Sequence, residues 1–144
     1  NLQILNFLYS PIFKLPIEIY KLRNLRHLLG LYHDRTSGHN LDAIYGIRTP
    51  KGIGGLENLH MVSVVDANYG GADLIKELEK LRQLRWLGIV KLTTETGRVL
   101  CASIQTMNHL ERMDLVASSM EEIIDLYSIS SPPPLLRRLV LRCR

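Results

Sequence analysis

The sequence has little of what small secreted domains and membrane proteins depend on. Only two of its 144 residues are cysteines, Cys101 and Cys143, and they lie far apart in the chain. No asparagine lies in an Asn-X-Ser/Thr glycosylation site. A secreted domain held together by disulfides is therefore disfavoured, and a reducing compartment is expected. No apolar run approaches the ~18 residues that a membrane helix requires, so no membrane span is predicted.

The chain also lacks a strong excess of one charge. Its formal net charge is +4, charged residues make up 22% of the sequence, and the two signs are interspersed. This pattern is typical of a mixed protein surface rather than of a nucleic-acid-binding arm. Because 46% of the residues are hydrophobic, the chain has enough apolar material for the core of one ordinary domain.

The glycines of IRTPKGIGGLENLH, residues 47–60, raise the question of a phosphate-binding loop. Such a loop places a lysine and a hydroxyl residue directly after its last glycine, in the pattern G-x-x-x-x-G-K-[ST]. Here Lys51 precedes Gly52, Gly54 and Gly55, and neither this pattern nor G-x-G-x-x-G occurs anywhere in the chain. We therefore interpret the glycines as a turn between repeating units.

Two further sets of polar residues could suggest chemistry but lack its context. Ser103, His109 and Asp114 could be imagined as a catalytic triad, yet no activating motif accompanies them. His33, Asp34 and His39 match no strong metal-ligand spacing. We predict that the chain is not an enzyme and that it carries no catalytic residue, metal site or cofactor of its own.

The strongest signal is a repeated pattern of leucines. Six segments share it: NLQILNF, NLRHLLG, NLHMVSV, QLRWLGI, HLERMDL and LLRRLVL. Their central residues are Leu5, Leu28, Val62, Leu87, Met113 and Leu139, at intervals of 23, 34, 25, 26 and 26 residues. Each unit reads L-x-x-L-x-L, which predicts a short strand whose leucines point inward. This is the spacing of leucine-rich repeats, in which stacked neighbours share one core.

The pattern predicts an α/β fold in which residues 1–144 form one leucine-rich-repeat fragment of about six irregular repeats. It would be a curved solenoid with a parallel sheet on its concave face and short helices and loops on its convex side. A second apolar series, such as Leu100, Ile104 and Met107, predicts the convex helical turns. The long interval, residues 31–50, is expected to be an insertion containing a short extra strand at 43–47. Both ends of the fragment are expected to cut through the stack.

The alternating strand residues that point outward are the candidate binding residues. In the third repeat, Leu59, Val62 and Val64 are expected to point inward. The third outward column is predicted to be Leu8, Leu31, Val65, Val90, Val116 and Arg142. The concave face would then be apolar in its first and middle repeats and rich in arginine in the last ones, unless loops or a neighbouring domain cover it. The candidate protein-binding residues are His27, Met61, Trp86, Arg112, Arg138 and Arg142.

The repeats also resemble a particular family. LPIEIYKLRNLRHLL, RTPKGIGGLENLHMVSVVDA, ELEKLRQLRWLGI, LCASIQTMNHLERMDL and SISSPPPLLRRLVL, in this order and over nearly the whole chain, are similar to the leucine-rich-repeat region of plant nucleotide-binding immune receptors of the coiled-coil class. The usual Asn or Cys after the last strand leucine is replaced, by Ser10, His33, Ala67, Leu92 and Ser118. A more irregular solenoid is therefore expected.

The resemblance implies a module of a cytoplasmic disease-resistance receptor that senses pathogen effectors and restrains a switch domain. ATP or ADP would bind in that upstream domain and not in this chain. The implied partners are a pathogen effector or a host protein that the receptor guards (a guardee), together with the receptor's own nucleotide-binding domain. The alternative is the substrate-recruiting leucine-rich-repeat arm of a ubiquitin ligase.

Overall fold

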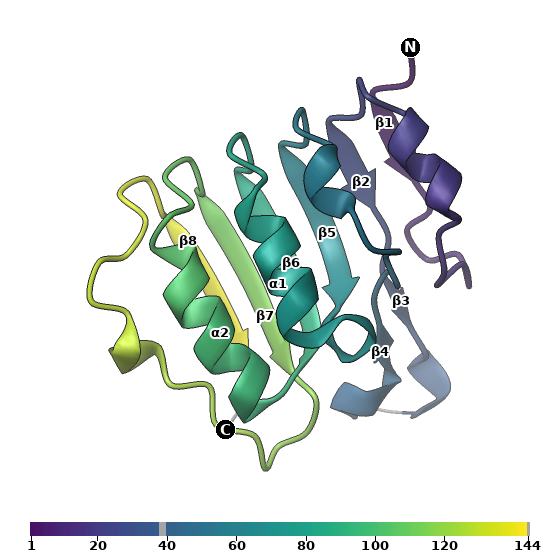
Figure 1. Cartoon of the computed structure of the whole chain (residues 1–144). Helices are drawn as coiled ribbons and strands as arrows, with labels where there is room; N and C mark the ends of the chain where they lie inside the picture. Colours follow the sequence, from purple (N-terminus) through teal and green to yellow (C-terminus); the bar gives the residue numbers. More distant parts are fainter. Residues whose placement is uncertain (38–39, 144) are drawn as a thin grey trace.

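The fold, in the computed structural model shown in Figure 1, is built on one parallel sheet. The structure describes residues 1–37 and 40–143, and within them the sheet has six strands. In spatial order these are β1 (Ile4–Asn6), β2 (His27–Leu29), β5 (Met61–Asp66), β6 (Trp86–Leu92), β7 (Arg112–Ala117) and β8 (Arg138–Arg142). Each strand pairs in parallel with the next one, so spatial order follows chain order.

The register of the sheet places the six central residues of the sequence repeats side by side. Leu5 pairs with Leu28, Leu28 with Val62, and Val62 with Leu87. The row continues from Leu87 to Met113 and Leu139. Because side chains alternate along a strand, this row points to one face and its flanking residues point to the other.

The longer helices cover one face of the sheet. The two α-helices, α1 (Gly71–Glu79) and α2 (Thr94–Ile104), lie in front of it in Figure 1, together with the single-turn helices η1 (Ile17–Lys21) and η4 (Ile53–Gly55). We call this side the helix face and the opposite side the open face. Shorter turns are η2 (Arg35–Ser37), η3 (Leu41–Ala43), η5 (Ala67–Tyr69) and η6 (Leu126–Ser128). No helix in the described residues is long and apolar enough to cross a bilayer.

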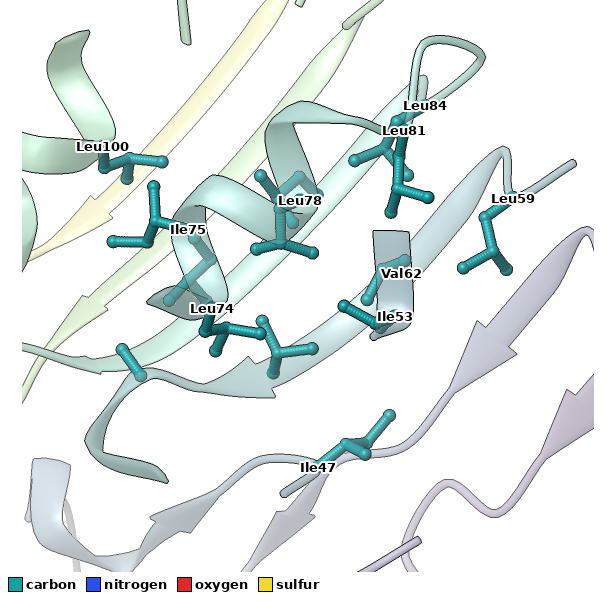
Figure 2. Close-up of a cluster of buried hydrophobic side chains, with 14 of the residues drawn as sticks. Ile47, Ile53, Leu59, Val62, Leu74, Ile75, Leu78, Leu81, Leu84 and Leu100 are labelled. Carbon is teal, nitrogen blue, oxygen red and sulfur yellow. The ribbon is translucent and has the colours of Figure 1, made fainter. Parts of the chain in front are cut away.

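The main core lies between the sheet and these helices. Leu87 and Met113 are 0% and 1% exposed there, as expected from the leucine spacing. Helix α1 contributes Leu74, Ile75 and Leu78, which Figure 2 shows packed over the strands beside Val62 and Leu84. Helix α2 contributes Leu100 and Ile104.

Local sequence explains where the elements begin. Thr93 and Thr96 form a reciprocal capping box at the start of α2, since each side chain bonds the other residue's backbone N–H. The strands of the sheet after β1 share one kind of turn at their entrance. In this turn, the backbone N–H of a leucine donates to the backbone carbonyl of the residue three positions earlier. The N···O distances run from 3.0 to 3.2 Å in the pairs Leu25–Leu22, Leu59–Leu56, Leu84–Leu81, Leu110–Met107 and Leu136–Pro133.

The insertion at residues 31–50 is more structured than a polar loop. It forms an antiparallel hairpin from β3 (Tyr32–His33) and β4 (Ile44–Tyr45). The extra strand is therefore shorter than the predicted 43–47, although Ile47 also makes an isolated bridge to Val65. Phe13 packs against the rings of Tyr32 and Tyr45, with centroids 5.6 and 5.3 Å away, which ties the hairpin to the first repeat.

A β-bulge in β5 overturns part of the predicted alternation. Between the pairs Val62–Leu87 and Val65–Ile89, strand β5 has two residues, Ser63 and Val64, where β6 has only Gly88. One extra residue reverses the faces of everything that follows it. Val64 therefore points to the open face and Val65 lies in the main core at 0% exposure, the reverse of the prediction.

Candidate functional site

The six predicted binding residues all belong to strands of the sheet, but they differ in their surroundings. His27, Met61, Trp86, Arg112 and Arg138 are consecutive partners in the register, one from each strand after β1. Each of them lies one position before the inward-pointing central residue of its strand. Because side chains alternate along a strand, these five point to the open face. The first four are half-buried, whereas Arg138 and Arg142 are exposed.

A hollow of about 320 Å³ on the open face brings four of the six together. Trp86, Arg112, Arg138 and Arg142 line it, whereas His27 and Met61 do not. The latter two lie in the same row on β2 and β5, outside the hollow. Val90, Val116, Val140 and Leu115 also line the hollow, together with Asp114.

Asp114 holds the tryptophan and one arginine in place. Its Oδ2 accepts hydrogen bonds from Trp86 Nε1 at 2.8 Å and from Arg112 Nε at 2.9 Å, and Arg112 also forms an ion pair with it at 2.8 Å. The Arg112 guanidinium lies 4.1 Å from the centre of the Trp86 ring, in cation–π geometry. Oδ1 of Asp114 is buried and has no hydrogen-bond partner in the described part of the chain. Two side chains of the neighbouring strand β7 therefore hold Trp86 in place.

The insertion covers much of the apolar part of the open face. Ile44 packs in a second small core with Val64, Val90 and Val116, which are 9%, 1% and 9% exposed. Gly88 makes room for this cluster, since a Cβ there would lie 2.9 Å from Val64 Cγ2. The broad exposed apolar area expected in the first and middle repeats is thus partly occupied by residues of the chain itself.

The remaining open part of this face carries uncompensated positive charge. Asp114 neutralises Arg112, but no hydrogen bond or ion pair joins the guanidinium of Arg138 or Arg142 to another described residue. The hollow thus combines an apolar floor, a fixed aromatic ring and two arginines that are available to a partner. This arrangement suits contact with a protein surface, and it contains no nucleophile and base in contact.

Comparison of the sequence with protein families agrees with this architecture. A family model described as a leucine-rich repeat region matches residues 1–144. The chain belongs to the leucine-rich repeat family. None of the curated proteins compared with it matches the chain. Leucine-rich repeat regions are generally non-catalytic modules that bind other proteins, so this chain is a protein-interaction module.

The leucine-rich repeat does not bring the imagined triad together. Ser103 lies on α2, on the helix face, where its Oγ donates to Glu79 Oε2 at 3.1 Å. His109 lies in the turn before β7, and Asp114 lies on the open face. His39 of the imagined metal site lies outside the described residues. Among the described residues, no group of three His, Cys, Asp or Glu side chains is placed to hold a metal ion.

The glycines after Lys51 serve the repeat structure. Gly52 has φ of 102° and caps the single turn η4, a conformation that favours glycine. The N–H of Gly54 donates to Glu77 Oε2 at 3.1 Å, so this N–H is already bonded to a carboxylate of the chain itself. This hydrogen bond and the Lys80 ammonium, which is the larger cause, lower the pKa of Glu77.

Sequence reasoning missed the role of Asp114 in the leucine-rich repeat. A signal was present, because residues two apart on a strand share a face, and Arg112 and Asp114 are such a pair. The register then brings Asp114 opposite Gly88, two residues along β6 from Trp86.

Proposed function

We propose that this chain is the sensing and regulatory leucine-rich-repeat region of a cytoplasmic plant immune receptor. The order of its motifs supports the receptor class, and the sheet with helices on one face is compatible with a curved solenoid of about six repeats. In this proposal the module is non-catalytic. It binds a pathogen effector or a guarded host protein and restrains an upstream domain that binds ATP or ADP.

The observation that carries the proposal is the hollow beside Trp86. A large aromatic side chain that is already held in one orientation loses little conformational entropy when a partner covers it. Such residues commonly dominate binding energy once water is excluded. Because Asp114 and Arg112 fix the Trp86 ring, we propose that it is the anchor of the interface.

The unpaired arginines define the character of the partner. Arg138 and Arg142 are exposed at the edge of the hollow, and neither guanidinium forms an ion pair with a described residue. Positive charge at the rim of an interface raises the association rate of an acidic partner and makes that rate sensitive to salt. We therefore propose an acidic patch, on an effector or on the receptor's own switch domain, as the contacting surface.

Substitution of Trp86 tests the anchor role. In the full receptor, Trp86→Ala is expected to increase the dissociation rate of the partner and to change the cell-death response, while the module still folds. Tyr127→Ala is the matched control, because Tyr127 is an aromatic residue that is 99% exposed in η6. A Trp86→Ala module whose thermal melt collapses would show that the ring is structural, and the anchor role would be rejected.

Charge reversal tests the arginine flank separately. The double change Arg138→Glu and Arg142→Glu is expected to slow association and to reduce its salt dependence, with little effect on dissociation. An unchanged association rate would contradict the steering role.

The receptor class is tested outside this chain. The gene segment that encodes the residues upstream of Asn1 is expected to encode a nucleotide-binding domain with a phosphate-binding loop. An F-box segment there would favour the ubiquitin-ligase arm instead.

A further inference from the structure

The strand entrances form a second surface, distinct from the hollow. At these entrances the shared turn brings polar residues to the surface close to one apolar residue, as Arg23 and Arg26 lie close to the buried Leu25. These turns lie along the upper edge of the sheet in Figure 1, where the loops lead into the strands. We call this surface the N-terminal edge and define it by Arg23, Arg26, Glu57, His60, Arg82, Gln83, Arg85, His109, Glu111 and Arg137.

Backbone hydrogen bonds arrange the edge residues in a regular row. The N–H of His60 donates to Arg26 O at 2.8 Å, and that of Arg85 to His60 O at 2.8 Å. The ladder continues from Glu111 to Arg85 at 2.7 Å and from Arg137 to Glu111 at 2.9 Å. Neighbouring strands are about 4.8 Å apart, so side chains from repeats distant in sequence lie within reach of one partner surface.

Positive charge dominates this row, and little of it is neutralised. Glu57 and Glu111 are the acids of the edge, against the five arginines named above. Arg85 and Glu111 form only a loose, exposed ion pair at 3.9 Å, which stabilises little. The guanidinium groups of Arg26, Arg82 and Arg137 form no hydrogen bond or ion pair with other described residues.

A small hollow lies in the middle of the edge. Its volume is about 160 Å³, and its lining residues are His60, Gln83, Arg85 and His109. The His60 Nε2 lies 3.0 Å from Gln83 Oε1, which orients the imidazole across neighbouring turns. A hollow lined by an arginine and two imidazoles suits a carboxylate side chain.

We propose that the N-terminal edge is a second docking surface and that its partner is the acidic surface of a protein. The two glutamates among the arginines favour a partner of mixed charge pattern, with carboxylates opposite the arginines and a cation opposite Glu111. A uniform polyanion would meet repulsion at both glutamates. The edge residues also include no phenylalanine, tyrosine or tryptophan, the large rings on which the bases of single-stranded nucleic acids commonly stack.

A peptide-binding measurement tests this surface without knowledge of the natural partner. The probes are a fluorescein-labelled acidic peptide, in which one lysine interrupts a run of glutamates, and a labelled thymidine oligonucleotide of equal net charge. Both are titrated with the chain at low and at physiological salt. The chain is expected to bind the peptide, and Arg26→Glu with Arg82→Glu is expected to weaken binding by about tenfold, because several close charge contacts are reversed. Glu111→Gln is expected to weaken it, because the lysine of the peptide loses its carboxylate partner.

A double variant with the same change in net charge gives the control. Arg35→Glu with Arg98→Glu reverses two exposed arginines away from the edge, on η2 and α2. It is expected to weaken peptide binding much less than the edge variant does. Equal losses in the two variants would show that only net charge matters and would overturn the proposal, as would failure to bind the peptide.

Tighter binding of the oligonucleotide than of the peptide would also overturn the proposal, since it would identify a nucleic-acid surface. These outcomes do not depend on Trp86 or on the receptor class. The edge proposal and the proposed function can therefore fail independently.

Discussion

The same position in successive repeats is buried to very different extents. Along the central row, Leu28, Val62, Leu87 and Met113 are at most 1% exposed, whereas Leu139 is 41% exposed. The first four have a strand on each side, but β8 pairs within the described sheet only with β7. The contribution of a leucine to stability therefore depends on its neighbours as well as on its place in the repeat.

This gradient gives a prediction for paired truncations. Leu87→Ala is expected to lower the free energy of unfolding by about 2–5 kcal/mol, because it removes apolar contacts and leaves a cavity in a fully packed site. Leu139→Ala is the matched control and is expected to cost clearly less. Chemical denaturation of both variants measures the difference, and equal losses would contradict the observed register.

Tyr20 gives a second prediction at the residue scale, through its ionisation. Burial, and secondarily the charge of Glu77, raises the pKa of Tyr20 to about 12, and its hydroxyl donates to the carbonyl of Pro50. Because the folded pKa lies above the unfolded value, the stabilisation from the neutral phenol is complete below pH ~10 and is lost as the pH rises toward 12. Tyr20→Phe is expected to lose less stability over this alkaline range. Thermal melts from pH 9 to 12 would measure this difference. If the melting temperatures of wild type and Tyr20→Phe fell equally with pH, the raised pKa of Tyr20 would be contradicted.

At the scale of elements, leucine spacing predicts strand positions well but cannot locate irregularities. Burial of Leu87 and Met113 follows directly from the repeat, since a period of two fixes the face of each residue. The bulge in β5 could not be foreseen, because Val64 and Val65 are equally suited to a core position. The covering of the open face by Ile44 was also hidden, since it depends on contacts between an insertion and strands far along the chain.

The start of α2 offers a prediction for one element. Glu122, in the segment after β7, accepts hydrogen bonds from Thr94 N at 2.6 Å and Thr94 Oγ1 at 2.8 Å, which places a carboxylate at the positive end of the helix. These hydrogen bonds lower the pKa of Glu122. Glu122→Gln is therefore expected to lower the melting temperature at neutral pH.

The pH dependence of this effect follows from the lowered pKa. Stabilisation by the carboxylate is present above its unfolded pKa and is lost as pH falls through the folded one, so the two melting curves should converge in acid. Glu121→Gln, a neighbouring exposed glutamate, is the control and should leave the melt unchanged. If the difference in melting temperature between wild type and Glu122→Gln stayed constant from neutral to acidic pH, the capping role would be contradicted.

For the whole molecule, the exposed borders of the sheet have the largest consequence. Ile4 on β1 is 52% exposed and Leu139 on β8 is 41% exposed, and both strands have one edge without a strand partner in the described chain. Unpaired strand edges with apolar residues favour association with another copy.

We therefore expect the isolated chain to self-associate as its concentration rises. Ile4→Lys, which places a charge on the border strand, is expected to shift the equilibrium toward monomer. Sedimentation velocity over a wide concentration range measures both proteins. A chain that stays strictly monomeric at high concentration would contradict this expectation.

Each strand contributes one residue to the row Trp86, Arg112 and Arg138 on the open face. This arrangement affects how the binding specificity of that face could change. Trp86, Arg112 and Arg138 are successively 26 residues apart in sequence but occupy adjacent strands. A recombination event that exchanged one 26-residue repeat would replace the surface residues of a single strand. The backbone hydrogen bonds between the other strands, and the residues they position, would remain. Linear peptides cut from the chain would, for the same reason, fail to reproduce the surface that a partner or an antibody meets.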